Sequence, residues 1–322
     1  MGLPPCFIPV DEAYGSAATN LTEQDQVRQW ATLTGPLSIW ADECCSTYAG
    51  GPLHESHPLV LSGEYQGPMA CLGAPRPSNP SRRLFVVGDS HGTMLLPGLQ
   101  AIFAREHFSV VHNTVASFGC GFNPVEMLNG TLRNLAWFGG QRNEEISLDC
   151  ASHVNDVWAA LQAHVQQDDV VMVATAYHRF WWMNASTALR VNSEFLAQLN
   201  DQVIAPRGAQ LVLIDDIFFA PEQAITCAGE CSFASSGKFN APESNDDRQA
   251  LVNAAHSALT ATAPNVHFVK VLFDSLCDGS TCHMRVPGTS AMAYMDDDHL
   301  SSQGAMYVAP FIACAFEEAG LL

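Results

Sequence analysis

Ser90 lies in a Gly-Asp-Ser-His-Gly segment, residues 88–92, directly after the apolar run 84–87. A serine between a strand end and a helix start is exposed, and the helix amides beside it favour a developing oxyanion. Far downstream, Asp296 precedes His299 in an Asp-x-x-His pattern, so one short loop carries an imidazole and a carboxylate that orients it. A serine nucleophile needs such a general base. Each pattern alone is more typical of a plain turn or a helix cap, but together they predict nucleophilic catalysis at Ser90.

Apolar runs and helical periodicity alternate from residue 83 onward. Strands are predicted at 84–87, 109–115, 170–174, 210–214 and 266–271, and helices at 93–106, 154–165, 193–203, 247–260 and 301–319. Continuously apolar strands separated by helices indicate a parallel sheet that is covered on both faces. We therefore predict an α/β fold, a three-layer α/β/α sandwich with a five-stranded parallel sheet. Residues 116–150 read as irregular.

The chain divides by composition near residue 80. Residues 1–80 are rich in Cys, Pro and Gly and are predicted to form an extension that packs on the core, while 81–322 form the catalytic domain. In a parallel sheet, ligands bind at the carboxyl ends of the strands. Asp215 and Asp216 follow the fourth strand there, and they either line the cleft or cap the next segment. We favour capping.

These motifs resemble those of the SGNH (GDSL-like) hydrolase superfamily, over about residues 82–320. Within it the chain is most similar to the SGNH domains appended to polysaccharide-modifying membrane acyltransferases, which share Gly-Asp-Ser-His after the first strand. They also share a Cys-x-n-Cys loop, here Cys277 and Cys282, shortly before Tyr-x-Asp-x-x-His-Leu-Ser, here residues 294–301. PC-esterases share the two catalytic blocks. The resemblance implies a flavodoxin-like SGNH fold.

The resemblance also implies roles for individual residues. Ser90 matches the nucleophile, His299 the base and Asp296 the residue that orients this base. The oxyanion hole is expected to use the amides of Ser90 and Gly119, with Gly121 as an alternative glycine. No cofactor and no metal are expected.

One family block is missing. After the third predicted strand the chain has no Gly-x-Asn-Asp, the block whose asparagine completes the family's oxyanion hole. Loss of one oxyanion donor costs about 2.7–4 kcal/mol in transition-state stabilisation, so another group is expected to replace it. Tyr177, His178 and Arg179 stand there and either replace the donor or contact the substrate.

Further substrate contacts are predicted from three residues beside the catalytic segment and the aromatic run. Trp181 either stacks on a sugar ring or covers the core or surface, which is the more common use of such an aromatic run. Asp89 and His91 flank the nucleophile, and His91 is expected to shape its turn rather than to act as a base.

Composition restricts the partners. With 33 acidic against 14 basic side chains and a net charge of -19, the chain does not fit a nucleic-acid binder. No stretch reaches the roughly 18 uninterrupted apolar residues that span a bilayer, so no integral membrane segment is predicted. The expected substrate is an acylated carbohydrate.

Eleven cysteines are many for a reducing compartment. Disulfides are favoured over zinc, because no pair of Cys-x2-Cys knuckles is present. Together with three Asn-x-Ser/Thr sequons, at Asn20, Asn129 and Asn184, they predict a secreted or lumenal glycoprotein whose signal has been removed. Cys277 is expected to pair with Cys282, and Cys227 with Cys231.

We predict a serine esterase that removes O-acetyl or other short acyl groups from a carbohydrate. O-acetyl transfer to a sugar hydroxyl by the same site is the alternative, since both reactions pass through an acyl-serine. A non-catalytic carbohydrate-binding relative is a second alternative, because the asparagine block is missing. A metallophosphoesterase also starts with Gly-Asp-x-His-Gly, but its other metal-binding blocks are missing.

Overall fold

The computed structural model describes most of the chain from residue 82 onward. The described residues are 82–103, 108–114, 122, 132–138, 141–148, 150–176, 185–218, 225–228, 230–233, 238–240, 243–279, 281–288, 293–294 and 299–322. The predicted extension, residues 1–80, lies outside them.

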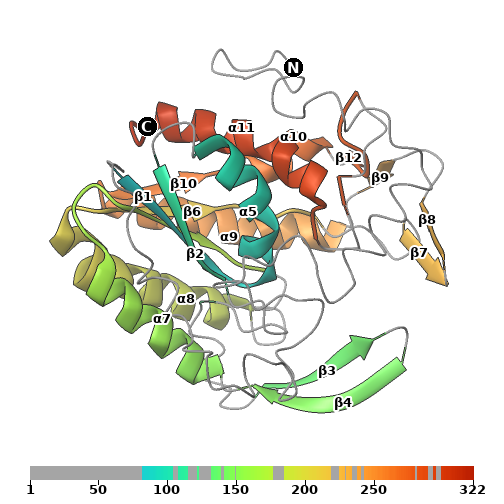
Figure 1. Ribbon diagram of the computed structural model, residues 1–322, viewed down its shortest axis with the longest axis horizontal. Helices are drawn as coiled ribbons and strands as arrows, with labels where there is room; N and C mark the ends of the chain where they lie inside the picture. Colours follow the sequence, from blue (N-terminus) through green and yellow to red (C-terminus); the bar gives the residue numbers. More distant parts are fainter. Residues whose placement is uncertain are drawn as a thin grey trace.

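A five-stranded parallel sheet forms the centre of the fold (Figure 1). Its strands are β1 (Arg82–Gly88), β2 (Phe108–Thr114), β5 (Val170–Ala174), β6 (Gln210–Ile214) and β10 (Val266–Val269). They lie in the order β10-β6-β5-β1-β2, and each neighbouring pair is parallel. The five strands predicted from apolar runs correspond to these five, and the α/β class is confirmed. The order reverses between β1 and β5, which makes their carboxyl ends the topological switch point.

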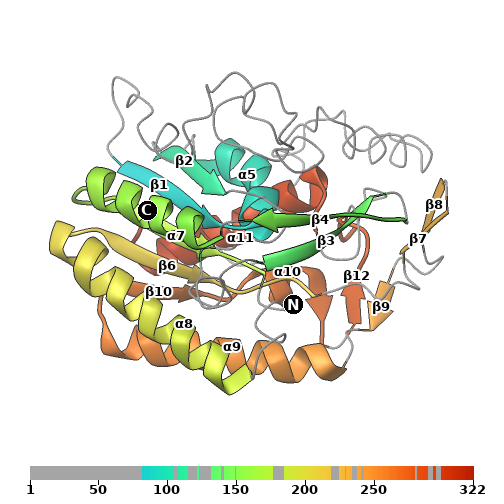
Figure 2. The same ribbon diagram turned by 90° about the horizontal axis from the view of Figure 1, so that it is seen from below.

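Helices cover both faces of this sheet. Figure 1 shows α5 (Ser90–Phe103) and α11 (Ser302–Glu318) on one side, and α7 (Cys150–His164) and α8 (Ala185–Leu199) on the other. In the turned view of Figure 2, α9 (Glu243–Thr262) runs beside α8, and the two helices are in contact. None of the described helices has the length and apolar character needed to cross a membrane.

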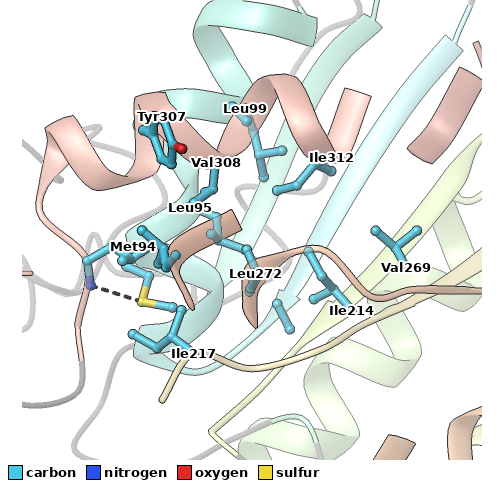
Figure 3. Packing of buried hydrophobic residues seen from close by; sticks show 14 of the residues in the cluster. Met94, Leu95, Leu99, Ile214, Ile217, Val269, Leu272, Tyr307, Val308 and Ile312 are labelled. Atoms are coloured by element: carbon cyan, nitrogen blue, oxygen red, sulfur yellow. Dashed lines mark hydrogen bonds between the residues drawn. The ribbon is translucent and has the colours of Figure 1, made fainter. Parts of the chain in front are cut away.

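The core consists of two apolar clusters, one on each face of the sheet. Along β1, Leu84 and Val86 belong to one cluster, and Phe85 and Val87 belong to the other. Strands place successive side chains on opposite faces, so a strand buried on both sides is apolar at every position. The first cluster contains side chains of α5 and α11 such as Leu99 and Ile312 (Figure 3).

The start of α5 differs from its prediction. We expected the helix to begin at residue 93, and it begins at Ser90. The carboxylate of Asp89 accepts a hydrogen bond from the backbone amide of His91 at 2.9 Å, so it satisfies a donor of the first turn. The serine is therefore the first helical residue rather than part of a longer loop.

The region predicted to be irregular contains a hairpin. Strands β3 (Leu132–Phe138) and β4 (Gln141–Leu148) pair antiparallel. A second hairpin, β7 (Ile225–Ala228) with β8 (Glu230–Phe233), places Cys227 directly opposite Cys231.

The predicted disulfide between Cys277 and Cys282 is confirmed. It joins β11 (Cys277–Asp278) to β12 (Thr281–His283), and β12 also pairs with β9 (Lys238–Asn240). Cys314 in α11 is disulfide-bonded as well.

Candidate active site

The Gly-Asp-Ser segment lies at the switch point of the sheet. Gly88 ends β1, where its backbone runs against that of β5: a Cβ at this position would stand 1.6 Å from the carbonyl oxygen of Ala174. No side chain fits that space, so the close approach requires glycine. It brings the residues after β1 next to those after β5.

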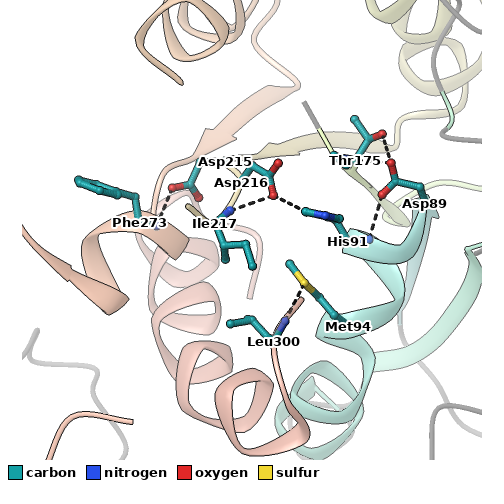
Figure 4. Close-up of polar contacts among 10 residues, drawn as sticks. Asp89, His91, Met94, Thr175, Asp215, Asp216, Ile217, Phe273 and Leu300 are labelled. Carbon is teal, nitrogen blue, oxygen red and sulfur yellow. Dashed lines mark hydrogen bonds and ion pairs between the residues drawn. The ribbon is translucent and has the colours of Figure 1, made fainter. Parts of the chain in front are cut away.

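Asp89 connects the two strand ends (Figure 4). One carboxylate oxygen accepts hydrogen bonds from the hydroxyl of Thr175 at 2.9 Å and from the amide of Ala176 at 2.8 Å. The other accepts from the amide of His91. Asp89 is fully buried, and it holds the turn that carries Ser90 against the end of β5.

His91 connects the same turn to a third strand. Its Nδ1 lies 2.6 Å from an oxygen of Asp216, the second residue after β6, and that oxygen also accepts from the amide of Ile217 (Figure 4). Both His91 and Asp216 are buried. The residues after β1 are therefore fixed to the ends of both β5 and β6.

Asp215, the neighbour of Asp216, caps a helix. Its carboxylate accepts from the amides of Val271, Leu272 and Phe273 at the start of α10 (Leu272–Leu276). Burial raises the pKa of this carboxyl to about 7, with Asp216 adding to the rise and the three amides opposing it. Asp215 therefore caps a helix as expected, but the helix is α10, which follows β10, and not the segment directly after β6.

His299 approaches the same place from the far end of the chain. Its ring centroid lies 5.2 Å from that of His91, with the two planes tilted by 57°. The next amide, that of Leu300, donates to the sulfur of Met94 on α5 at 3.3 Å (Figure 4). Ser301 caps α11, because its side chain accepts from the amide of Gly304. The loop that carries His299 is thus anchored to both α5 and α11.

Tyr294 lies beside this arrangement. It forms an antiparallel bridge with Leu300 and is almost fully buried. Burial raises the pKa of its phenol, and the charge of Asp216 raises it further. This tyrosine therefore stays neutral next to the carboxylate.

A family model decides what kind of domain this is. The model described as "SGNH domain (fused to AT3 domains)" matches residues 56–313 of the chain. The chain belongs to this family. The matched region begins at residue 56, before the domain boundary that we predicted near residue 80. It also begins before residue 82, where the sequence resemblance to the superfamily was expected to start.

One solved structure shares the fold of this SGNH domain, and another is more distantly similar. The periplasmic domain of a lipopolysaccharide acetyltransferase from Salmonella ser. Paratyphi A is 12% identical, with a TM-score of 0.51 and coverage of 94% of this chain and 97% of that one. A protein assigned as a platelet activating factor from Streptococcus pneumonia is 14% identical, with a TM-score of 0.42 and coverage of 78% and 88%. No curated protein matches the sequence.

The structure brings some of the predicted site residues of this SGNH domain together. Asp89 and His91 flank the backbone of Ser90 and are hydrogen-bonded to each other, and the ring of His299 packs against that of His91. The side chain of Ser90 lies outside the described part, as do the residues Gly119, Gly121, Tyr177, His178, Arg179, Trp181 and Asp296.

Two contacts were not predicted from the sequence. Asp216 binds His91 across 125 positions of sequence, and Thr175 binds Asp89 across 86. Thr175 is the first residue after a predicted strand and Asp216 the second, and this position was the available signal. Among the residues that the structure describes, no group of three or more His, Cys, Asp or Glu side chains is arranged to hold a metal ion.

Proposed function

We propose that this SGNH domain is a serine esterase that removes O-acetyl or other short acyl groups from a carbohydrate. One observation carries the proposal: His299, more than 200 residues away in sequence, is anchored beside the helix start at which Ser90 stands. The family match supports acyl chemistry. A strand-to-helix turn with an imidazole beside it is what nucleophilic catalysis by serine requires.

In the proposed reaction, His299 takes the proton of Ser90 as the hydroxyl oxygen attacks the ester carbonyl. The amides of Ser90 and Gly119 stabilise the oxyanion, and Asp296 orients the imidazole. The bond to the sugar oxygen then breaks, and that oxygen takes the proton from His299. Water attacks the acyl-serine, His299 accepts a proton from this water, and the released Ser90 regains one.

Acyl transfer is the second candidate. It differs only in the attack of a sugar hydroxyl, instead of water, on the acyl-serine. The family description, a domain fused to AT3 acyltransferase domains, favours it, and so does the acetyltransferase among the structures that share the fold. These relatives and the two disulfide-bonded sites, Cys277 with Cys282 and Cys314, also support a location outside the cytoplasm.

Fluorophosphonate labelling tests the site. We expect the wild type to be labelled at Ser90 and to hydrolyse p-nitrophenyl acetate. Ser90→Ala and His299→Ala should each abolish turnover, and Asp296→Ala should reduce it less. A wild type that is not labelled, or substantial turnover by Ser90→Ala, would refute the proposal.

The two fates of the acyl group require a second assay. Acetate release is measured from a panel of acetylated polysaccharides, with and without an unacetylated acceptor sugar. Release that is independent of the acceptor indicates hydrolysis. An acceptor that becomes acetylated while free acetate falls indicates transfer.

A further inference from the structure

A buried pair of ionisable residues that the proposed reaction does not use lies next to His299. His91 and Asp216 are 2% and 3% exposed, and 2.6 Å separates the ring nitrogen Nδ1 from the carboxylate oxygen. A hydrogen bond this short to a carboxylate fixes the orientation of an imidazole ring. The backbone of His91 is fixed as well, since its amide donates to Asp89.

The fixed ring of His91 contacts the ring of His299. The centroids are 5.2 Å apart and the planes are tilted by 57°, a spacing at which aromatic rings pack against each other. Asp216 therefore acts on His299 through one intermediate side chain. The contact joins the end of β6 to the loop that carries the proposed base.

Three other ionisable groups lie near this pair in the part of the chain that the structure describes. The carboxylate of Asp89 faces Thr175 and two backbone amides, and Asp215 faces the start of α10. Tyr294, which faces Asp216, has a raised pKa and stays neutral.

We propose that His91 and Asp216 form a positioning pair, which holds the imidazole of His299 in the orientation that proton transfer from Ser90 requires. The inference rests on the proposed function. A displacement of about 1 Å in a catalytic group lowers the rate about 100-fold, so the ring of His299 gains from a support in addition to Asp296, the proposed orienting residue.

Two variants and their combination test the pair. Asp216→Asn keeps the shape and one acceptor but removes the charge, and His91→Gln removes the ring. We expect each to lower kcat for p-nitrophenyl acetate 10- to 100-fold, normalised to the amount of Ser90 that fluorophosphonate labels, with KM within twofold. The double variant should be no worse than the more damaged single variant, because the two residues act as a unit. Asp278→Asn, which removes an exposed charge, is the control and should match the wild type.

A spectroscopic measurement separates this inference from the proposed function. The side-chain 15N signals of His299, assigned with His299→Gln, should move in Asp216→Asn and stay in place in Asp278→Asn. If the wild type is not labelled but the His299 signals still move in Asp216→Asn, the proposed function is wrong and the contact between the pair and His299 is supported. Unmoved His299 signals, or a normalised kcat within twofold of the wild type in both single variants, would overturn the pair.

Discussion

Thr175→Val tests whether the bond between β5 and Asp89 positions the Ser90 turn. The two side chains have the same shape, so valine fills the same space without the hydroxyl. The hydroxyl donates to the carboxylate of Asp89 at 2.9 Å, and both residues are buried, at 3% and 0% exposure. The substitution therefore removes one hydrogen bond to a buried carboxylate and little else.

The expected cost follows from the charge of the acceptor. A hydrogen bond to a charged group contributes about 1.5–3 kcal/mol, so the free energy of unfolding should fall by about 2 kcal/mol. For a domain of this size, that lowers the melting temperature by roughly 4–8 °C. Because Asp89 also binds the amide of His91, the helix start should move, and we expect labelling of Ser90 to slow about tenfold.

Thr175→Ser is the matched control. It keeps the hydroxyl and loses one methyl group, at a cost of about 1 kcal/mol. Both variants are thus destabilised, but only Thr175→Val should be labelled slowly by fluorophosphonate, measured per folded protein. Two results together would contradict the positioning role of Asp89. They are labelling of Thr175→Val at the wild-type rate, and a free energy of unfolding within about 0.5 kcal/mol of the wild type, which is the change typical of a surface substitution.

Three further tests address other parts of the structure. Arg83→Met leaves the buried carboxylate of Asp169 without the guanidinium 2.6 Å away, so the free energy of unfolding measured with denaturant should fall by about 3–5 kcal/mol. Arg190→Met is the comparison: it breaks an exposed ion pair with Glu194 and should lower the free energy of unfolding by less than about 0.5 kcal/mol. The pKa of Asp215 is raised from 3.8 to about 7, so the folded state holds a proton that the unfolded state has lost. The contribution of Asp215 to the free energy of unfolding is therefore fully present below about pH 4. As the pH rises to about 7 this contribution is lost, and the loss is at most about 4 kcal/mol. In Asp215→Asn this part of the pH dependence of unfolding should disappear, and an unchanged profile would contradict the shift. Replacing Cys277 and Cys282 together by Ala should lower the free energy of unfolding by about 2 kcal/mol, because the bond closes a short loop.

The sheet was predictable because its strands are buried on both faces. A run such as 170–174 is apolar at every position and needs no partner to be recognised. The β3–β4 hairpin was missed because its strands do not alternate between apolar and polar residues. The one local turn signal is the pair Gly139-Gly140, which stands between the two strands in the sequence.

The site was predictable only as a set of separate motifs. The Gly-Asp-Ser turn and the segment of His299 are local patterns, and the sequence alone shows both. The bond between His91 and Asp216 has no local pattern, because it depends on which strand ends lie near one another. For the same reason α5 was expected to begin three residues late: a carboxylate held by β5 is not visible as a helix cap in the sequence.

The order of the strands explains why two carboxylates, those of Asp89 and Asp216, hold the turn that carries Ser90. β5 lies between β1 and β6, so the ends of β1 and β6 are two strand spacings apart, about 10 Å. Asp89 is long enough to reach the adjacent strand, β5, but not the one beyond it. A histidine and an aspartate facing each other cover the longer distance, as His91 and Asp216 do. Asp89 also accepts a hydrogen bond from the amide of His91, so both carboxylates act on His91. Loss of either carboxylate should therefore displace Ser90 through the same first turn of α5.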